Sequence, residues 1–171
     1  MGSDAAPGID DLEVRLEKAA ETGVDRDGVN AILADFARQN GLPEIALDAD
    51  GAATLELDGA DETLVVTLLH TSGAAGLLVG ADMTDGTATS PRCRRLALMA
   101  NGGGGATAGG VFGLVSGDSR LHLLHQVLLS GLDGEAFGRA LMSFAELAAS
   151  WRDRLDLELD IDADLSADTA T

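Results

Sequence analysis

The sequence predicts an α+β domain with an antiparallel sheet, and three observations lead to that fold class. Apolar residues recur at helical spacing in several separate segments. Between those segments lie alternating or β-branched runs bounded by Gly, Asp and Ser, which is the pattern of short strands joined by turns. Strands and helices do not alternate regularly, as they do around a parallel sheet. At 171 residues the chain is long enough for one domain with a sizeable core.

Two helical patterns open the chain. The first, over residues 9–20, predicts a short amphipathic helix. The second is more strongly marked, because Asp25 or Asp27 can cap its start and Asn40 and Gly41 form a C-terminal stop. Its apolar residues recur at the spacing of one buried face: Val29, Ile32, Leu33, Phe36 and Ala37.

A strand-rich region follows. Residues 41–58 predict two short alternating strands, over residues 45–47 and 55–57, joined by a turn that contains Asp-Gly. The run over residues 63–69 carries apolar residues at both odd and even positions, so we expect a central strand that is covered on both faces. A further short strand is possible over residues 77–79.

The second half of the chain predicts a helix, a hairpin and a final helix. Ser90 followed by Pro91 is a good helix start. The hairpin strands cover residues 111–115 and 120–129, and Asp133 caps the last helix. That helix carries a long apolar stripe made of Phe137, Ala140, Leu141, Phe144, Ala148, Trp151 and Leu155.

Three regions are therefore expected. Residues 1–24 form an N-terminal extension with a short helix, and residues 25–155 form the folded domain. Residues 156–171 alternate acidic with apolar residues and contain no base, which favours a disordered tail over a further strand.

Charge and composition exclude several classes of partner. The formal charge of −18 repels nucleic-acid phosphates and anionic lipid, and aromatic residues make up only 3% of the chain. The basic cluster Arg92, Arg94 and Arg95 is better interpreted as a solvated helix face than as an anion site. Cys93 is the single cysteine, so no internal disulfide forms, and we expect a reducing cytosol. No signal peptide or membrane span is predicted.

No catalytic, cofactor or metal site is predicted. The glycine run at residues 103–108 fits a relaxed dinucleotide pattern, but a helix precedes it and a strand follows, which is the reverse of the required order. His122 and His125 point to opposite faces of a strand, so they cannot share a metal ion. Cys93 is better interpreted as a small buried residue than as a nucleophile. We expect that the protein is not an enzyme.

What remains is apolar surface. The strand over residues 121–129 carries leucines on both faces, which is more than one side of a small domain needs. Either a partner covers the excess, as a second copy or an extended peptide, or a helix of the same chain does.

Across about residues 26–155 the chain resembles the class I type III secretion chaperones, the Tir chaperone (CesT-like) family. The resemblance rests on short motifs that follow one another in order: Ile32-Leu33-Ala34-Asp35-Phe36-Ala37, Gly41-Leu42-Pro43, Leu47-Asp48-Ala49-Asp50-Gly51, Leu55-Glu56-Leu57-Asp58, Leu98-Met99-Ala100-Asn101, Gly109-Gly110-Val111-Phe112-Gly113-Leu114, Phe144-Ala145-Glu146 and Trp151-Arg152.

The resemblance implies an α-β-β-β-α-β-β-α fold, here with an extra N-terminal helix, in a bacterial cytosolic homodimer. Such chaperones bind the N-terminal region of a secreted effector in extended form, partly by adding effector strands to a sheet edge, and keep it competent for export. It also implies dimer contacts through the middle helix and effector contacts on the first helix and the sheet. The expected dimer contacts are Leu96, Met99 and Ala100. The expected effector contacts are Leu42, Ile45, Leu124 and Leu128. The alternative is a fold relative that acts as a regulatory or structural interaction module without a role in secretion.

Overall fold

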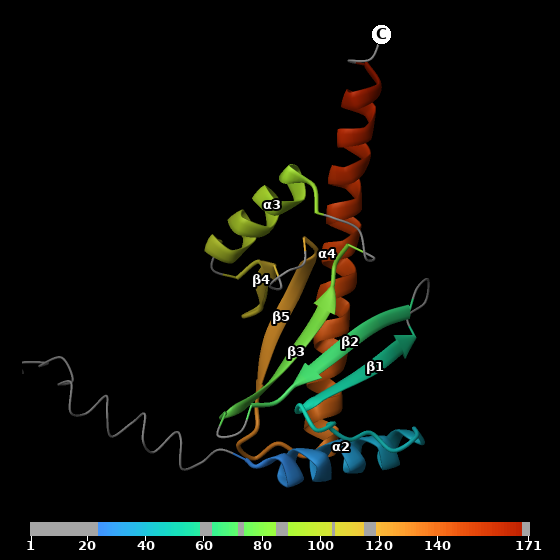
Figure 1. Ribbon diagram of the computed structural model, residues 1–171, viewed down its shortest axis with the longest axis vertical. Coiled ribbons are helices and arrows are strands. Elements are labelled where there is room, and N and C mark those ends of the chain that lie inside the picture. Colours follow the sequence, from blue (N-terminus) through green and yellow to red (C-terminus); the bar gives the residue numbers. More distant parts are fainter. Residues whose placement is uncertain are drawn as a thin grey trace, which may run out of the picture.

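The computed structural model describes residues 24–58, 63–71, 74–84, 89–103, 105–114 and 119–168. Its elements follow the predicted α-β-β-β-α-β-β-α order, which confirms the fold class (Figure 1). The elements are α2 (Arg26–Asn40), β1 (Ala52–Asp58), β2 (Thr63–Leu69), β3 (Gly76–Asp82), α3 (Pro91–Gly102), β4 (Val111–Leu114), β5 (Leu121–Leu128) and α4 (Gly134–Asp168). The helix predicted over residues 9–20 lies outside the described residues.

The five strands form one antiparallel sheet in the order β1-β2-β3-β5-β4. Figure 1 shows α4 running along the sheet, α2 crossing one end and α3 beside β4 at the other end. β1 and β4 are therefore the two edge strands.

Each helix begins at the residue that the sequence predicts, because a side-chain oxygen there accepts a hydrogen bond from the first turn. Asp25 accepts from the Gly28 N–H at 2.8 Å. Ser90 accepts from the Cys93 N–H at 3.2 Å, and Asp133 accepts from the Ala136 N–H at 2.8 Å. These bonds satisfy backbone donors that have no partner inside the helix.

The core lies between one face of the sheet, the inner face, and the helices. Phe36 of α2 and Phe137 of α4 pack edge to face with ring centroids 5.2 Å apart, and Phe112 of β4 packs against Trp151 of α4 at 5.0 Å. The inner face of the sheet is aliphatic, and its buried residues are Leu55, Leu64, Val66, Leu68, Leu77, Val79, Ala81, Leu121, Leu123 and Val127.

The prediction of a strand over residues 45–47 is wrong. Residues 42–48 are irregular, because side chains bind their backbone groups in place of a neighbouring strand. The Leu47 N–H donates to Oδ1 of Asn30 on α2 at 2.8 Å. The Asp48 carboxylate accepts from the N–H groups of Asp50 and Ala52, both at 2.9 Å. An Asp side chain that binds the backbone just ahead of it closes a turn without a β-ladder.

Two further expectations differ from the structure. β2 is covered on one face only: its burial alternates strictly, and Val65 and Leu69 are exposed, because α2 and α4 both lie on the inner face. Residues 156–168, for which the charge pattern predicts disorder, continue α4. Leu155 is buried and anchors the preceding turns, and each residue added to a helix gains one backbone hydrogen bond.

Candidate partner-binding surfaces

The outer edge of β1 presents free backbone groups. Gly51 C=O accepts from the His70 N–H on the β2 side at 2.8 Å, whereas the N–H and C=O of Ala52 both bind Asp48 on the opposite side. Strand groups alternate in direction, so those of Thr54 and Glu56 also point away from β2. Within the described parts of the chain, no hydrogen bond reaches these outward groups. The β1 edge is therefore open to a further strand.

An open groove of about 320 Å³ runs beside this edge. One wall is the irregular segment that precedes β1, and the other is the start of β1 itself. Its lining residues are Glu44, Ile45, Ala46, Asp48, Ala52, Ala53 and Thr54. Backbone donors and acceptors next to a groove that takes alternate side chains are the two features that recognition of an extended peptide requires.

Leu42 and Ile45, both predicted partner contacts, lie at or near this groove but differ in exposure. Leu42 is 45% exposed, and its N–H donates to the Ala37 carbonyl at 2.9 Å, which fixes it just beyond the end of α2. Ile45 lines the groove and packs partly against the core. Both residues belong to the segment that joins α2 to β1.

The outer face of the sheet, opposite the helices, carries the other two predicted contacts. Leu128 is 64% exposed at the end of β5. Leu124 is half-buried, because its side chain packs over Gly80 of β3. The packing is so close that a Cβ added to Gly80 would lie 2.9 Å from the Cδ2 atom of Leu124. Leu124 thus covers the glycine of the neighbouring strand. Val65 and Leu69 of β2 are also exposed on this face, and sequence reasoning missed them because it expected a covered strand.

An exposed apolar surface lies on α3 and β4, far from the β1 edge in the sheet order. Met99 is 64% exposed, and Leu98 beside it is 71% exposed. Leu96 is half-buried, whereas Ala100 is 5% exposed and faces the core. The edge strand β4 also exposes Val111 and Leu114, both about half exposed, but the alternation of the strand places them on opposite faces of the sheet. We call Leu98 and Met99, on the helix beside β4, the α3–β4 patch.

The helical period explains which α3 residues face outward. Cys93, Ala97 and Ala100 are the buried positions of α3. A residue five positions after Cys93 is rotated by about 140° from it, which places Leu98 on the exposed side. That rotation was a signal available in the sequence, and it identifies Leu98 rather than Ala100 as a surface residue.

Side chains with catalytic or metal-binding potential are dispersed. Cys93 is buried, with its Sγ 3.6 Å from the Leu155 carbonyl oxygen, as expected for a packed residue. His125 lies on the inner face near Phe144, and His122 lies on the outer face across from Asp82, so the predicted opposition of the two histidines is confirmed. The described residues contain no cluster of three or more His, Cys, Asp or Glu side chains that could hold a metal ion.

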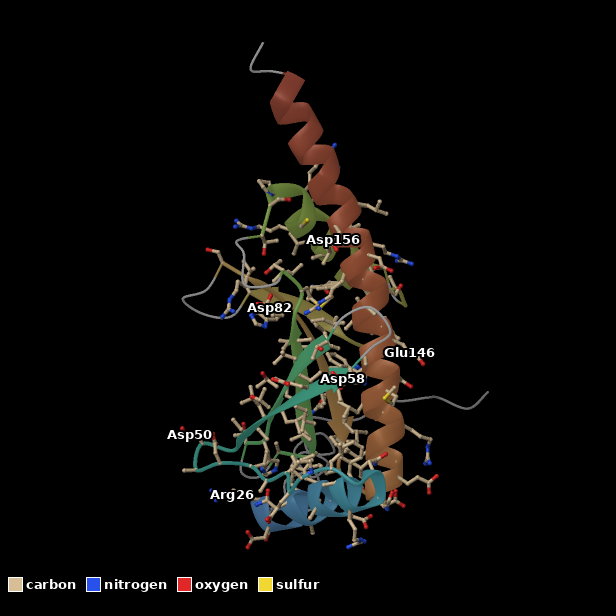
Figure 2. The ribbon with its side chains drawn as sticks, turned by 90° about the vertical axis from the view of Figure 1, so that its right-hand side faces the viewer. Arg26, Asp50, Asp58, Asp82, Glu146 and Asp156 are labelled. Atoms are coloured by element: carbon tan, nitrogen blue, oxygen red, sulfur yellow. The ribbon has the colours of Figure 1, made fainter. Side chains whose placement is uncertain are left out.

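The surroundings of the β1 edge are acidic. Asp50 lies at the tip of the turn before β1, at the margin of the molecule, and Figure 2 labels Asp58 at the far end of the same strand. Glu44, Asp48 and Glu56 are exposed on the same two segments, and Glu44 and Asp48 line the groove. An acidic rim of this kind complements a partner that brings basic residues.

Among the described helices, none has both the length and the apolar composition that a membrane crossing requires.

Comparison with known proteins gave one family and a set of similar folds. The model of the Tir chaperone protein (CesT) family matches residues 31–152. No curated protein matches the chain.

Three solved structures are similar to this chain. A chain in the crystal structure of the ExsC-ExsE complex is 30% identical, with a TM-score of 0.62 over 77% of this chain and 97% of that one. A chain of the HopA1-SchA chaperone-effector complex is 18% identical, with a TM-score of 0.60 over 77% and 99%. A chain of the complex of the Yersinia pestis type III secretion chaperone SycH with a stable fragment of YscM2 is 20% identical, with a TM-score of 0.53 over 71% and 98%. At these lower identities the last two show a shared fold.

Proposed function

We propose, because this chain belongs to the Tir chaperone protein (CesT) family, that it is a cytosolic bacterial chaperone that binds the N-terminal region of a type III secretion effector. Binding keeps that region extended and competent for export. The observation that carries this proposal is the open β1 edge with its adjacent groove. We assign the role to residues 25–155, with residues 1–24 and 156–171 outside the binding unit.

Strand addition at β1 supplies the affinity. An extended effector segment would pair with the outward N–H and C=O groups of Thr54 and Glu56 and place alternate side chains into the groove beside Ile45. The segment is unfolded before binding, so part of the interaction energy offsets the entropy lost when it becomes ordered. Backbone pairing alone carries little sequence information. The groove and its rim therefore select the partner.

The predicted apolar contacts divide into two regions. Ile45 lines the groove beside the edge and Leu42 is exposed earlier in the same segment, and we propose that they receive the first apolar side chains of the effector. Leu124 and Leu128 lie on the outer face of the sheet, with Leu128 the more exposed of the two. A segment that contacts both regions would wrap around the sheet rather than lie in one pocket. This arrangement fits a long unfolded segment better than a short peptide.

The rim chemistry defines the partner further. Glu44, Asp48 and Glu56 place negative charge along the groove, in a chain whose formal charge is −18. We therefore propose an effector segment with apolar residues at alternate positions and with Lys or Arg residues between them. Opposite charges would speed the encounter and align the segment on the edge.

A second copy of the chain is the proposed partner at the other end of the sheet. The α3–β4 patch is apolar and exposed, and it lies away from the β1 edge. A homodimer through this patch would bury Met99 and the half-buried Leu96, and would leave both β1 edges available. This chaperone role requires neither a catalytic group nor a cofactor.

The test is co-expression with the proteins encoded next to this one. We expect one neighbouring product to co-purify through its N-terminal region. Thr54→Pro should then weaken that complex at least tenfold, because proline removes the outward N–H while leaving the β1–β2 ladder intact. Thr54→Ala, which removes only the side chain, is the matched control and should bind normally. Calorimetry with the purified N-terminal region measures both.

Two outcomes would count against the proposal. If no neighbouring product is retained and the protein is a monomer, an interaction module without a role in secretion becomes the better description. If the partner binds Thr54→Pro as well as the unchanged protein, the β1 edge is not its binding site.

A further inference from the structure

The second edge of the sheet, on β4, is occupied by a side chain. Asn101, in the last turn of α3, donates from Nδ2 to the Phe112 carbonyl at 2.9 Å. In return its Oδ1 accepts from the Phe112 N–H at 2.8 Å. A carboxamide carries N–H donors and a C=O acceptor on neighbouring atoms, so it can bond the C=O and the N–H of one strand residue at the same time. Asn101 therefore binds β4 as one residue of a neighbouring strand would.

The outward N–H group two residues earlier, that of Gly110, is also hydrogen-bonded within the chain. The Gly110 N–H donates to the Thr107 carbonyl at 2.7 Å, within the turn that leads into β4. The backbone N–H and C=O groups of successive strand residues point to alternate sides, so those of Gly110 and Phe112 both point away from β5. The outward N–H groups of Gly110 and Phe112 are thus bonded inside the chain, which leaves Leu114, the last residue of β4, as the remaining outward position. The outward N–H groups of Thr54 and Glu56 on β1 have no such bond.

The asparagine does not simply complete its own helix. Asn40, in the corresponding position at the end of α2, donates from Nδ2 to the carbonyl of Phe36 four residues earlier, within the same helix. Asn101 instead reaches eleven residues ahead in the chain, to the sheet. Both of its polar atoms are used there. Its contacts serve the strand edge.

We propose that Asn101 closes the β4 edge to strand addition, so that a partner strand is directed to β1 and contacts at the β4 end are made by side chains alone. An open edge strand pairs readily with other chains, and natural proteins block such edges. The choice of β1 by the effector rests on the proposed function. The closure of the β4 edge itself does not, and it can be measured on the protein alone.

Amide hydrogen exchange tests the closure directly. In Asn101→Ala, the Phe112 amide should exchange roughly tenfold faster, because it loses its only partner. The Gly113 amide, which points toward β5, should change little and serves as an internal reference against general loss of stability. Asn40→Ala is the matched control and should leave the Phe112 amide unchanged. Asn101→Asp keeps an acceptor for this amide but sets a carboxylate oxygen against the Phe112 carbonyl, so its Phe112 amide should exchange at a rate between those of Asn101→Ala and the unchanged protein.

Sedimentation velocity tests the consequence. Asn101→Ala should form assemblies of at least twice the mass of the unchanged protein, as open β4 edges pair with one another. Asn40→Ala, which leaves the bonds at β4 intact, is the matched control and should keep the original mass. These measurements need no effector, so they remain decisive even if no neighbouring product binds.

Three results would overturn the inference. The first is equal acceleration of the Phe112 and Gly113 amides in Asn101→Ala, which would mean general destabilisation. The second is an unchanged Phe112 amide in that variant. The third is equally large assemblies in Asn40→Ala, because these would form without any change at the β4 edge.

Discussion

The segment between α2 and β1 begins at Gly41 and ends at Gly51, and both glycines have a positive φ. Their surroundings differ. Gly41, at φ 65°, follows α2, and a Cβ there would meet no atom within 4 Å. Gly51, at φ 79°, lies directly against the strand pair, and a Cβ there would overlap the carbonyl oxygen of His70. The Gly51 carbonyl also accepts from the His70 N–H. The same backbone conformation therefore carries one constraint at Gly41 and two at Gly51.

Alanine at each glycine should separate these constraints. Gly41→Ala should lower the free energy of unfolding by about 1 kcal/mol, the cost of a left-handed conformation for a residue with Cβ. Gly51→Ala should lower it by about 3 kcal/mol or more, because the backbone of β2 must also move. Urea denaturation measures both. Equal losses would mean that the turn before β1 relaxes without disturbing the ladder.

The helices of this protein depend on side-chain caps at their starts. α3 is the clearest case, because it is short and three arginines occupy its exposed face. Its first turn contains no acidic residue to balance the helix dipole. The hydrogen bond from the Cys93 N–H to Ser90 is the main support of that end, together with Pro91 at the first helical position.

Ser90→Ala should therefore lower the free energy of unfolding by about 1 kcal/mol. Ser143→Ala is the matched control, since Ser143 is exposed within α4, where alanine favours the helix by up to about 0.5 kcal/mol. Thermal denaturation followed by circular dichroism compares the two. A loss in Ser143→Ala as large as that in Ser90→Ala would contradict a specific role of the cap.

The molecule as a whole has different chemistry at the two ends of its sheet. The β1 end offers backbone groups and acidic side chains, and the α3–β4 end offers apolar side chains with a closed edge. The first suits an unfolded segment of another protein, and the second suits a folded surface that buries leucine and methionine. We therefore propose that two different partners bind at the same time.

The dimer proposal makes a prediction for the intact protein. Leu98→Asp combined with Met99→Asp should halve the mass measured by sedimentation equilibrium, because two charges would be buried at the interface. Met142→Asp is the matched control, since Met142 is similarly exposed on α4 and lies outside the α3–β4 patch. If the Leu98 and Met99 variant keeps the mass of the unchanged protein, the copies do not meet through this patch.

Local pattern is enough to locate most of the regular elements of this chain. Ser90 and Asp133 mark helix starts, and the hairpin of β4 and β5 follows from two apolar runs around a turn. Such features depend on residues within a few positions of one another, where spacing and capping chemistry are visible. Most of the motifs that resemble the chaperone family lie in the described helices and strands, and the match of the family model over residues 31–152 confirms the family.

The two sheet edges follow from contacts that no local pattern contains. Asn30 binds Leu47 across 17 positions and keeps residues 42–48 out of the sheet, which leaves β1 as an edge. Asn101 binds Phe112 across 11 positions and closes the opposite edge. An asparagine side chain does not reveal which distant backbone it will reach, because folding brings the two together. Periodicity therefore predicted the strands of this protein, and long-range hydrogen bonds determined which of them is free to bind.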